Sequence, residues 1–250
     1  MTAARLALLA PLMLGAAKPV LVPDVSQRSI EIRYSFTGAE LLLFGAILYP
    51  GGRVPETPVD IAVVVKGPTE SVLLREKRKV AGIWMNVGAA RFRSAPAFYA
   101  VASSRPLSAL IDAKTAAIYE IGLDGLQMSP TGGALPEEQR RYEAGLVDLR
   151  RRNGLYSERA DGVEISGGVL YRARIDVPAR VPVGRYTAET FLIQDGHVLT
   201  AAVRPIDIDK SGFERFVAIA ADRWSLAYGI AAVAVSLLIG WGAGALFRRR

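Results

Sequence analysis

Gly184-Arg-Tyr-Thr-Ala-Glu-Thr-Phe-Leu-Ile-Gln-Asp-Gly-His-Val-Leu-Thr-Ala-Ala-Val203 is the stretch that decides the fold of this 250-residue chain. Two segments rich in β-branched, aromatic and apolar residues flank Asp195-Gly196, a pattern typical of paired strands. A two-residue hairpin turn requires positive φ angles, which Asp and Gly tolerate. The stretch therefore predicts an antiparallel β-hairpin and a mainly β fold.

Short strand patterns recur on the N-terminal side of this hairpin, separated by Gly and Pro turns. Residues 29–36 alternate strictly between apolar and polar side chains, whereas residues 41–48 and 60–66 are almost continuous apolar runs. Further strands are expected at residues 71–80, 82–87, 98–103, 163–165 and 168–177. Gly45 is expected to mark a bulge or a close approach of two backbones. This spacing predicts an Ig-like antiparallel β-sandwich.

Two helical patterns interrupt the strands and predict a small helical insertion at about residues 104–154. The first has a serine cap at Ser103 or Ser104, Pro106 in its first turn, and helix formers through residue 121. The second covers residues 135–152, beginning with Pro-Glu-Glu and ending with three arginines, which suits the helix dipole. The insertion would lie within a β-sandwich domain at residues 18–210.

The C-terminal part of the chain has the properties of a membrane anchor. Residues 224–247 contain no Asp, Glu, Lys, Arg or His, and a helix of this length rises about 36 Å, enough to cross a hydrocarbon core of about 30 Å. The tail Arg248–Arg250 is expected on the cytoplasmic side. Residues 211–214 have the spacing of a capping box, which predicts a juxtamembrane helix at 211–223 that continues unbroken into the membrane.

The first 17 residues have the pattern of a secretory signal peptide. Arg5 supplies a positive charge, residues 6–16 form a short apolar run, and Gly15-Ala16-Ala17 offers the small residues of a cleavage site. An uncleaved anchor is the alternative that this pattern leaves open. With cleavage, the mature protein would be an exported domain held by one C-terminal transmembrane helix.

The charge balance and the absence of cysteine narrow the class of protein. The chain has no cysteine, so an exported domain would be held by its apolar core and not by disulfides. The formal charge is +7, but without Arg5 and Arg248–Arg250 there are 27 basic and 24 acidic residues, a net charge of +3. A mildly basic domain near an anionic membrane needs no nucleic acid as partner.

The residues that could carry catalysis are few. His197 is the one histidine and stands beside the hairpin turn, where an exposed strand end is the expected environment. No nucleophile elbow, P-loop or metalloprotease motif occurs, and one histidine without cysteine disfavours transition metals. We expect no catalytic, cofactor-binding or metal-binding residues. A serine–lysine or carboxylate pair stays open, because its members meet only in space.

Two groups of residues are candidate interaction surfaces. The first is basic with one aromatic residue, and could face an anion, a lipid headgroup or an acidic partner. Its members are Arg75, Lys77, Lys79, Arg91, Arg93 and Trp84. The alternative is an edge strand whose charges prevent aggregation.

The second group is a line of small residues at intervals of four in the membrane segment. Its members are Ala232, Ser236, Gly240 and Gly244. Small residues on one helix face let another transmembrane helix approach closely. The partner would be a second copy of the chain, forming a homodimer, or a multispan permease. The alternative is the general frequency of glycine in membrane helices.

Several short segments spread over nearly the whole chain carry a resemblance to a known family: residues 21–26, 45–48, 60–68, 82–86, 98–103, 105–107, 121–124, 181–186, 195–196 and 240–241. In these segments the chain resembles the putative transmembrane protein family of alphaproteobacteria. The resemblance implies an exported domain with a C-terminal span, often encoded beside sulfite-exporter-like anion permeases. It brings no catalytic residues and no established activity.

Together, these observations predict a single-pass protein of the bacterial inner membrane, with its N-terminal domain in the periplasm and its C-terminus in the cytoplasm. The expected function is non-enzymatic: an accessory or partner of an anion permease of the sulfite type. An alternative is an envelope module that binds a peptide, glycan or lipid through the Trp84 region or an exposed sheet edge. A second alternative is an envelope hydrolase.

Overall fold

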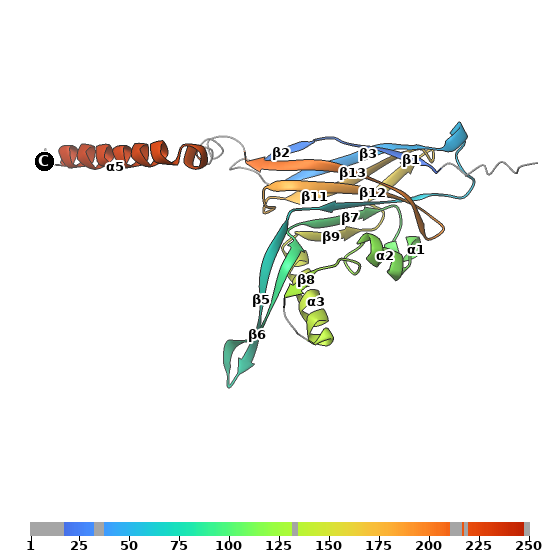
Figure 1. Cartoon of the computed structure of the whole chain (residues 1–250), viewed down its shortest axis with the longest axis horizontal. Helices are drawn as coiled ribbons and strands as arrows, with labels where there is room; N and C mark the ends of the chain where they lie inside the picture. The colour runs from blue at the N-terminus through green and yellow to red at the C-terminus, as the bar shows by residue number, and fades with distance from the viewer. Residues whose placement is uncertain (1–17, 33–37, 132–134, 211–216, 218–219, 248–250) are drawn as a thin grey trace, which may run out of the picture.

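The computed structural model describes residues 18–32, 38–131, 135–210, 217 and 220–247. Its described part is mainly β, with three sheets, small helices and one apolar helix near the C-terminus (Figure 1). The four-stranded sheet has the order β1 (Val20–Val25), β3 (Gly38–Leu48), β11 (Leu170–Pro178) and β10 (Val163–Ser166). The six-stranded sheet has the order β2 (Ser29–Ile32), β13 (His197–Lys210), β12 (Gly184–Gln194), β4 (Asp60–Lys66), β7 (Tyr99–Ser103) and β9 (Tyr156–Arg159).

The hairpin expected from Asp195-Gly196 is confirmed. Strands β12 and β13 pair antiparallel, and Gln194 lies opposite His197 across the turn. Asp195 and Gly196 have φ angles of 49° and 79°, as a two-residue turn requires. The expectation of purely antiparallel pairing is wrong at two places, because β2 pairs parallel with β13 and β9 pairs parallel with β7. The helical insertion separates β7 from β9, which gives the chain the length to return in the same direction.

The main core is one cluster to which strands of both larger sheets contribute. Strand β3 directs Leu41, Leu43 and Ile47 into it, and β4 is buried from Asp60 to Val65. The close backbone approach expected at Gly45 is confirmed, since a Cβ there would lie 2.5 Å from the carbonyl oxygen of Val22. Only glycine lets β1 pair so closely with β3 at this point.

The third sheet departs from the expected sandwich. Strands β5 (Thr69–Val80) and β6 (Ile83–Pro96) form a long ribbon with the short strand β8 (Ser129–Thr131), and this ribbon extends away from the larger sheets (Figure 1). Helix α3 (Pro136–Arg152) packs on one face of the ribbon. Phe92, Ala95 and Leu146 form a second buried cluster between them. The ribbon is therefore stabilised mainly by α3 and not by the main core.

The helical insertion differs from the expectation in its first part. Helices α1 (Leu107–Leu110) and α2 (Ala113–Tyr119) are separate, and the cap of α2 is Asp112, whose side chain accepts from the amide of Thr115 at 2.7 Å. The expected serine caps are used elsewhere: Ser103 Oγ donates to the carbonyl of Arg105, and Ser104 Oγ donates to Asp60. A short 3₁₀ turn, η1 (Pro50–Gly52), follows β3.

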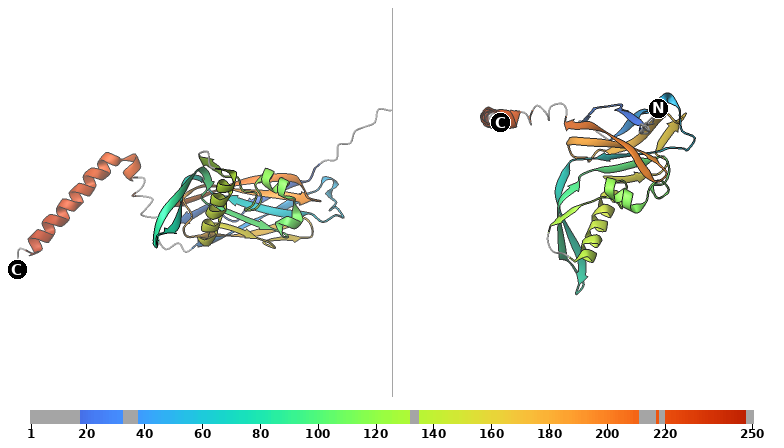
Figure 2. Two further views of the ribbon diagram at one scale, coloured as in Figure 1. Left: turned by 90° about the horizontal axis from the view of Figure 1, so that it is seen from below. Right: turned by 45° about the vertical axis from the view of Figure 1, so that its right-hand side comes forward.

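The C-terminal helix α5 (Ser225–Phe247) stands apart from the sheets (Figure 2). Its membrane-length segment has no buried residues. The expected unbroken entry into the membrane is wrong at Trp224, where a bend separates the helical residues 220–223 from α5. The expected signal peptide, and most of the juxtamembrane segment, lie outside the described residues.

Candidate functional site

The ribbon gathers the basic residues of the first candidate surface. On β5, Arg75, Lys77 and Lys79 alternate with side chains that face α3, and all three are exposed. Because directly paired residues share a face of a sheet, the register places Trp84 beside Lys79, and it places Arg91 beside Leu73, two pairs away from Arg75 and on the same face. Arg93 follows on β6 and is exposed. The six residues thus lie along the ribbon face opposite α3, which we call the basic face.

The acidic residues of the ribbon are paired with other arginines. Glu76 contacts Arg78 and Arg141 at 3.1 Å each, and Glu70 contacts Arg150. The hydrogen bond from Arg78, together with the charge of Arg141, lowers the pKa of the Glu76 carboxyl against the opposing effect of desolvation. Among the described residues, none of the five cations of the basic face lies within 4.0 Å of a carboxylate oxygen. Their charge is therefore available to something outside the described chain.

The apolar end of the ribbon is formed by Val80, Ile83, Trp84 and Met85, which we call the ribbon tip together with Ala81 and Gly82. Val80 pairs with Ile83 across a two-residue turn, in which Ala81 and Gly82 have φ angles of 48° and 85°. Ile83 is 70% exposed and Trp84 is 68% exposed. No part of the described fold covers these two large apolar side chains.

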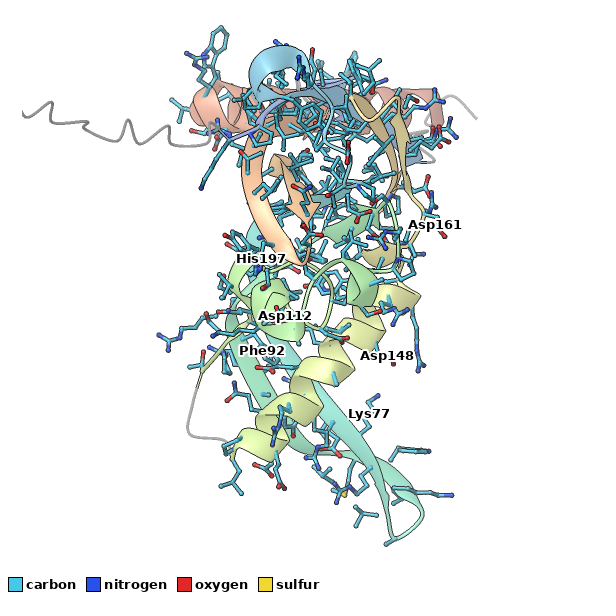
Figure 3. The ribbon with its side chains drawn as sticks, turned by 90° about the vertical axis from the view of Figure 1, so that its right-hand side faces the viewer. Lys77, Phe92, Asp112, Asp148, Asp161 and His197 are labelled. Carbon is cyan, nitrogen blue, oxygen red and sulfur yellow. The ribbon has the colours of Figure 1, made fainter. Side chains whose placement is uncertain are left out.

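The opposite face of the ribbon has a structural role. Phe92 points toward α3, as Figure 3 shows, and it is fully buried with Leu146. Tyr142 Oη on α3 lies 3.4 Å from Glu76, and a Cβ on Gly88 would lie 2.4 Å from the same hydroxyl. These contacts hold the ribbon in an extended position, because they fix one face of it against a helix of 17 residues.

The second candidate surface lies on α5. Ala232, Ser236, Gly240 and Gly244 follow one side of the helix at intervals of four residues. Ser236 Oγ donates to the carbonyl of Ala232 at 2.8 Å, so its hydroxyl is satisfied within the helix. A Cβ on Gly240 or Gly244 would meet no atom within 4 Å. Nothing in the described part of the chain packs on this side of α5.

The residues considered for catalysis are dispersed. His197 is exposed at the start of β13, and the bridge between Ile111 and Gly196 brings its strand next to Asp112 (Figure 3). The hydrogen bonds from Thr115 lower the pKa of the Asp112 carboxyl, and the charge of Lys114 adds to this effect. Among the described residues, no serine or threonine hydroxyl is hydrogen-bonded to His197, and no group of three His, Asp or Glu side chains is placed to hold a metal ion.

Lys66 lies between two carboxylates that belong to different elements. Its Nζ is 2.8 Å from Glu120 Oε2 at the end of α2 and 3.4 Å from Glu189 Oε2 on β12. Only 18% of the Lys66 side chain is exposed. This arrangement joins α2 to the outer face of the six-stranded sheet, and sequence reasoning missed it because its members are far apart in the chain.

A groove of about 680 Å³ lies between β9 of the six-stranded sheet and β11 of the four-stranded sheet. Residues of β9 and β11 line it, among them Ser157, Glu158 and Arg174. Arg159 Nη2 and Asp176 Oδ2 are 2.6 Å apart and join the two strands across it. No sequence pattern pointed to this groove, because residues 156–159 do not have the alternation of a strand.

A β-rich domain followed by one helix of 20 residues that is long and apolar enough to cross a bilayer defines a single-span class of membrane protein, as far as the described residues show. The chain belongs to the family described as "Putative transmembrane protein", whose model matches residues 20–249. This confirms the resemblance drawn from the sequence. Comparison with curated proteins gives no match.

Proposed function

We propose that this protein is a non-enzymatic accessory subunit that binds a multispan membrane protein through α5. In this proposal residues 1–17 direct export and the Ig-like β-sandwich domain works in the periplasm. The C-terminal arginines remain in the cytoplasm because of the positive-inside rule. A second copy of the chain, forming a homodimer, is the other helix partner to be tested.

The observation that carries the proposal is the line of small residues along one side of α5, a helix that no described residue covers. Glycine in a helix interior destabilises the helix by about 1 kcal/mol relative to alanine. The helix nevertheless has glycine at positions 240 and 244, where no described residue approaches. Small residues four apart let a second helix pack at short distance, which supplies the van der Waals contact that drives association in lipid. An anchor that only held the domain in the bilayer would not need such a side.

The class of partner is supported by the context that the family resemblance implies, namely genes beside anion permeases of the sulfite-exporter type. The structure adds that the domain preceding this anchor in the sequence has two uncovered surfaces, the basic face and the ribbon tip. A single-span subunit with no catalytic role is consistent with both features. The transported anion would be bound by the permease and not by this chain.

The proposal can be tested by crosslinking and mass spectrometry on native membranes. The variant Gly240→Leu with Gly244→Leu fills the small-residue side of α5. Gly242→Leu is the matched control, because residue 242 is about 200° from residue 240 around the helix and its Cβ also meets no described atom. We expect wild type and the control to capture a permease, and the double variant to lose it.

Capture of a permease that is unchanged in the double variant would contradict binding through this side of α5. Capture of a second copy of the chain, lost in the double variant, would replace the permease by a homodimer. The amount of each variant in the membrane, measured by immunoblot, shows whether a loss of crosslinks comes from a loss of protein.

A second candidate function is binding of an extended envelope peptide by strand addition. The observation that favours it is the groove between β9 and β11, where β9 pairs only with β7 in the described structure. An added strand would take main-chain hydrogen bonds from such an edge. Arg159→Ala with Asp176→Ala opens the groove without removing any core residue, and we expect it to change the binding of a peptide library to the full chain in detergent.

A further inference from the structure

We propose that the ribbon tip inserts into the anionic surface of the same membrane that α5 spans. The inference concerns a surface that the proposed helix interface does not use. The membrane would then hold the protein at two places, the transmembrane helix and the ribbon, and the domain would have a defined orientation above the bilayer.

The first argument is the exposure of the tip. Ile83 and Trp84 are the most exposed large apolar side chains of the β5–β6 ribbon, at 70% and 68%, and Met85 is 49% exposed. A tight turn in a folded domain is normally polar, since its side chains face water. Tryptophan favours the bilayer interface, where its ring lies among headgroups and its indole N–H stays hydrated. The tip has the composition of a segment that enters an interface.

The second argument is the order of residues along the ribbon. Lys79 lies beside Trp84, and Lys77 and Arg75 follow at increasing distance from the turn, all three without carboxylate partners among the described residues. When the tip enters the acyl-chain boundary, these cations lie at the depth of the lipid phosphates. Long basic side chains can then place their charge in the headgroup layer while their methylenes stay in apolar surroundings. Each such charge strengthens binding to an anionic surface by roughly fivefold.

The third argument is reach. Lys210 ends β13 and Ser225 begins α5, so residues 211–224 connect the β domain to the membrane helix; because residues 220–223 are helical, the connection spans at most roughly 40 Å. Strand β5 has 12 residues and is about 40 Å long. A surface tethered at this distance meets its own membrane at a high effective concentration. Even a weak membrane contact would therefore be populated.

A protein partner is a less suitable occupant of the tip. Stable protein interfaces bury roughly 800 Å² on each side. A two-residue turn flanked by four large apolar side chains is narrow and convex, so it offers little of that area. It suits a deformable lipid surface, which closes around a small protrusion and supplies the negative charge that the basic face lacks.

The experiment uses the full chain reconstituted into vesicles with no other protein present. Because the natural chain has no cysteine, Trp84→Cys can be labelled with one environment-sensitive nitrobenzoxadiazole fluorophore. Ile118→Cys is the matched control, since Ile118 is 64% exposed on α2 and lies outside the ribbon. The vesicles contain either phosphatidylcholine alone or phosphatidylcholine with phosphatidylglycerol in both leaflets, so that the protein's orientation does not matter.

We expect the label at residue 84 to shift its emission to the blue in anionic vesicles and to be quenched by a spin label on the lipid acyl chain. The label at residue 118 should show neither effect. Replacing Lys77 and Lys79 by Gln should reduce the quenching at residue 84 by several-fold in anionic vesicles. The circular dichroism of each variant shows that its fold is retained.

Quenching at residue 84 no greater than at residue 118 in anionic vesicles would overturn the proposal, as would a blue shift that appears only after a membrane extract with other proteins is added. Equal quenching in neutral and anionic vesicles would overturn the role given to the basic face. The proposed function can fail separately, because the vesicles contain no permease and the variants leave α5 unchanged.

Discussion

Arg105 Nε donates a hydrogen bond of 3.0 Å to Asp60 Oδ1, and this bond joins the first residue of β4 to the segment after β7. Ser104 Oγ donates to the same oxygen at 2.8 Å, and it accepts from the amide of Ile61 at 3.2 Å. Asp60 is the one charged residue that is buried in the described part, with 11% of its side chain exposed. A buried carboxylate is tolerated here because its oxygens are hydrogen-bonded to a cation and a hydroxyl.

Asp60 should make the stability of the protein fall in acid. Burial raises the pKa of its carboxyl, but the hydrogen bonds from Arg105 and Ser104 outweigh burial and hold the pKa below the ordinary value of 3.8. A depressed pKa in the folded state stabilises the fold above the unfolded pKa, and this contribution is lost as the pH falls through the folded pKa. We expect the melting temperature of the wild type to exceed that of Asp60→Asn at neutral pH and the difference to shrink below about pH 4.

The comparison with Asp60→Asn isolates this residue from other acids. The carboxyls of Asp24 and Asp112 also have lowered pKa values. The largest cause is a hydrogen bond from the Val25 amide for Asp24 and a hydrogen bond from Thr115 for Asp112. Both carboxyls are still present in the variant. Arg105→Ala, which leaves the buried Asp60 carboxylate without its cation, should lower the melting temperature at neutral pH. A melting-temperature difference that does not change with pH would show that the pair adds no charge-dependent stability.

Gly45 should not tolerate a side chain. An added methyl group would lie 2.5 Å from the carbonyl oxygen of Val22 and 2.7 Å from Tyr171 Oη, and the first of these is backbone that cannot move without disturbing the β1–β3 pairing. Overpacking of this kind typically costs about 1–3 kcal/mol. We therefore expect Gly45→Ala to lower the free energy of unfolding by that amount, measured by urea titration of the full chain in detergent. An unchanged midpoint would contradict the close approach.

Gly145→Ala should raise the free energy of unfolding, although it replaces glycine by alanine just as Gly45→Ala does. Gly145 lies inside α3, and its added Cβ would meet only Leu74 Cδ2, at the ordinary contact distance of 3.7 Å. Replacing a helix-interior glycine by alanine gains about 1 kcal/mol. The same urea titration should show a higher midpoint for the transition of α3, and a lower midpoint would mean that α3 needs the glycine for a partner.

The sequence predicted well those elements whose signals are local. The turn at Asp195-Gly196, the run from Asp60 to Lys66 and the acidic start of α3 each depend on neighbouring residues, and the structure has them at nearly the predicted bounds. Strand β9 was missed because Tyr156–Arg159 is short and has one buried residue, so no alternation was visible. Strand β1 was missed although Leu21 and Val25 alternate with exposed residues.

The candidate surfaces also combine local features, which the sequence predicts, with features that depend on distant residues, which it does not predict. Alternation along β5 is a local property, so the basic face could be recognised before the ribbon was known. The separation of the ribbon from the larger sheets could not be recognised from the sequence, because it depends on the contact of Phe92 with Leu146. These residues are 54 positions apart in the chain. The pairing of Asp60 with Arg105 and the position of Lys66 between Glu120 and Glu189 likewise depend on distant residues.

Leu146→Ala should loosen the ribbon without unfolding the larger sheets. Leu146 is fully buried against Phe92 and Ala95, in a cluster separate from the main core. Removing its side chain leaves a cavity and typically costs about 2–5 kcal/mol. Because few other contacts join the ribbon to the main core, this cost should appear as local opening. Hydrogen exchange followed by mass spectrometry should show faster exchange in β5, β6 and α3, with β4 and β12 unchanged.

Leu192→Ala is the matched control, since Leu192 is equally buried but belongs to the main core. Its cavity lies between the larger sheets, so we expect faster exchange in β4 and β12 as well as in the ribbon strands. Equal acceleration of all strands by Leu146→Ala would mean that the ribbon and the larger sheets unfold as one unit. Independent opening would instead show that the position of the ribbon tip can change while the domain remains folded, which is the property that a surface inserting into lipid requires.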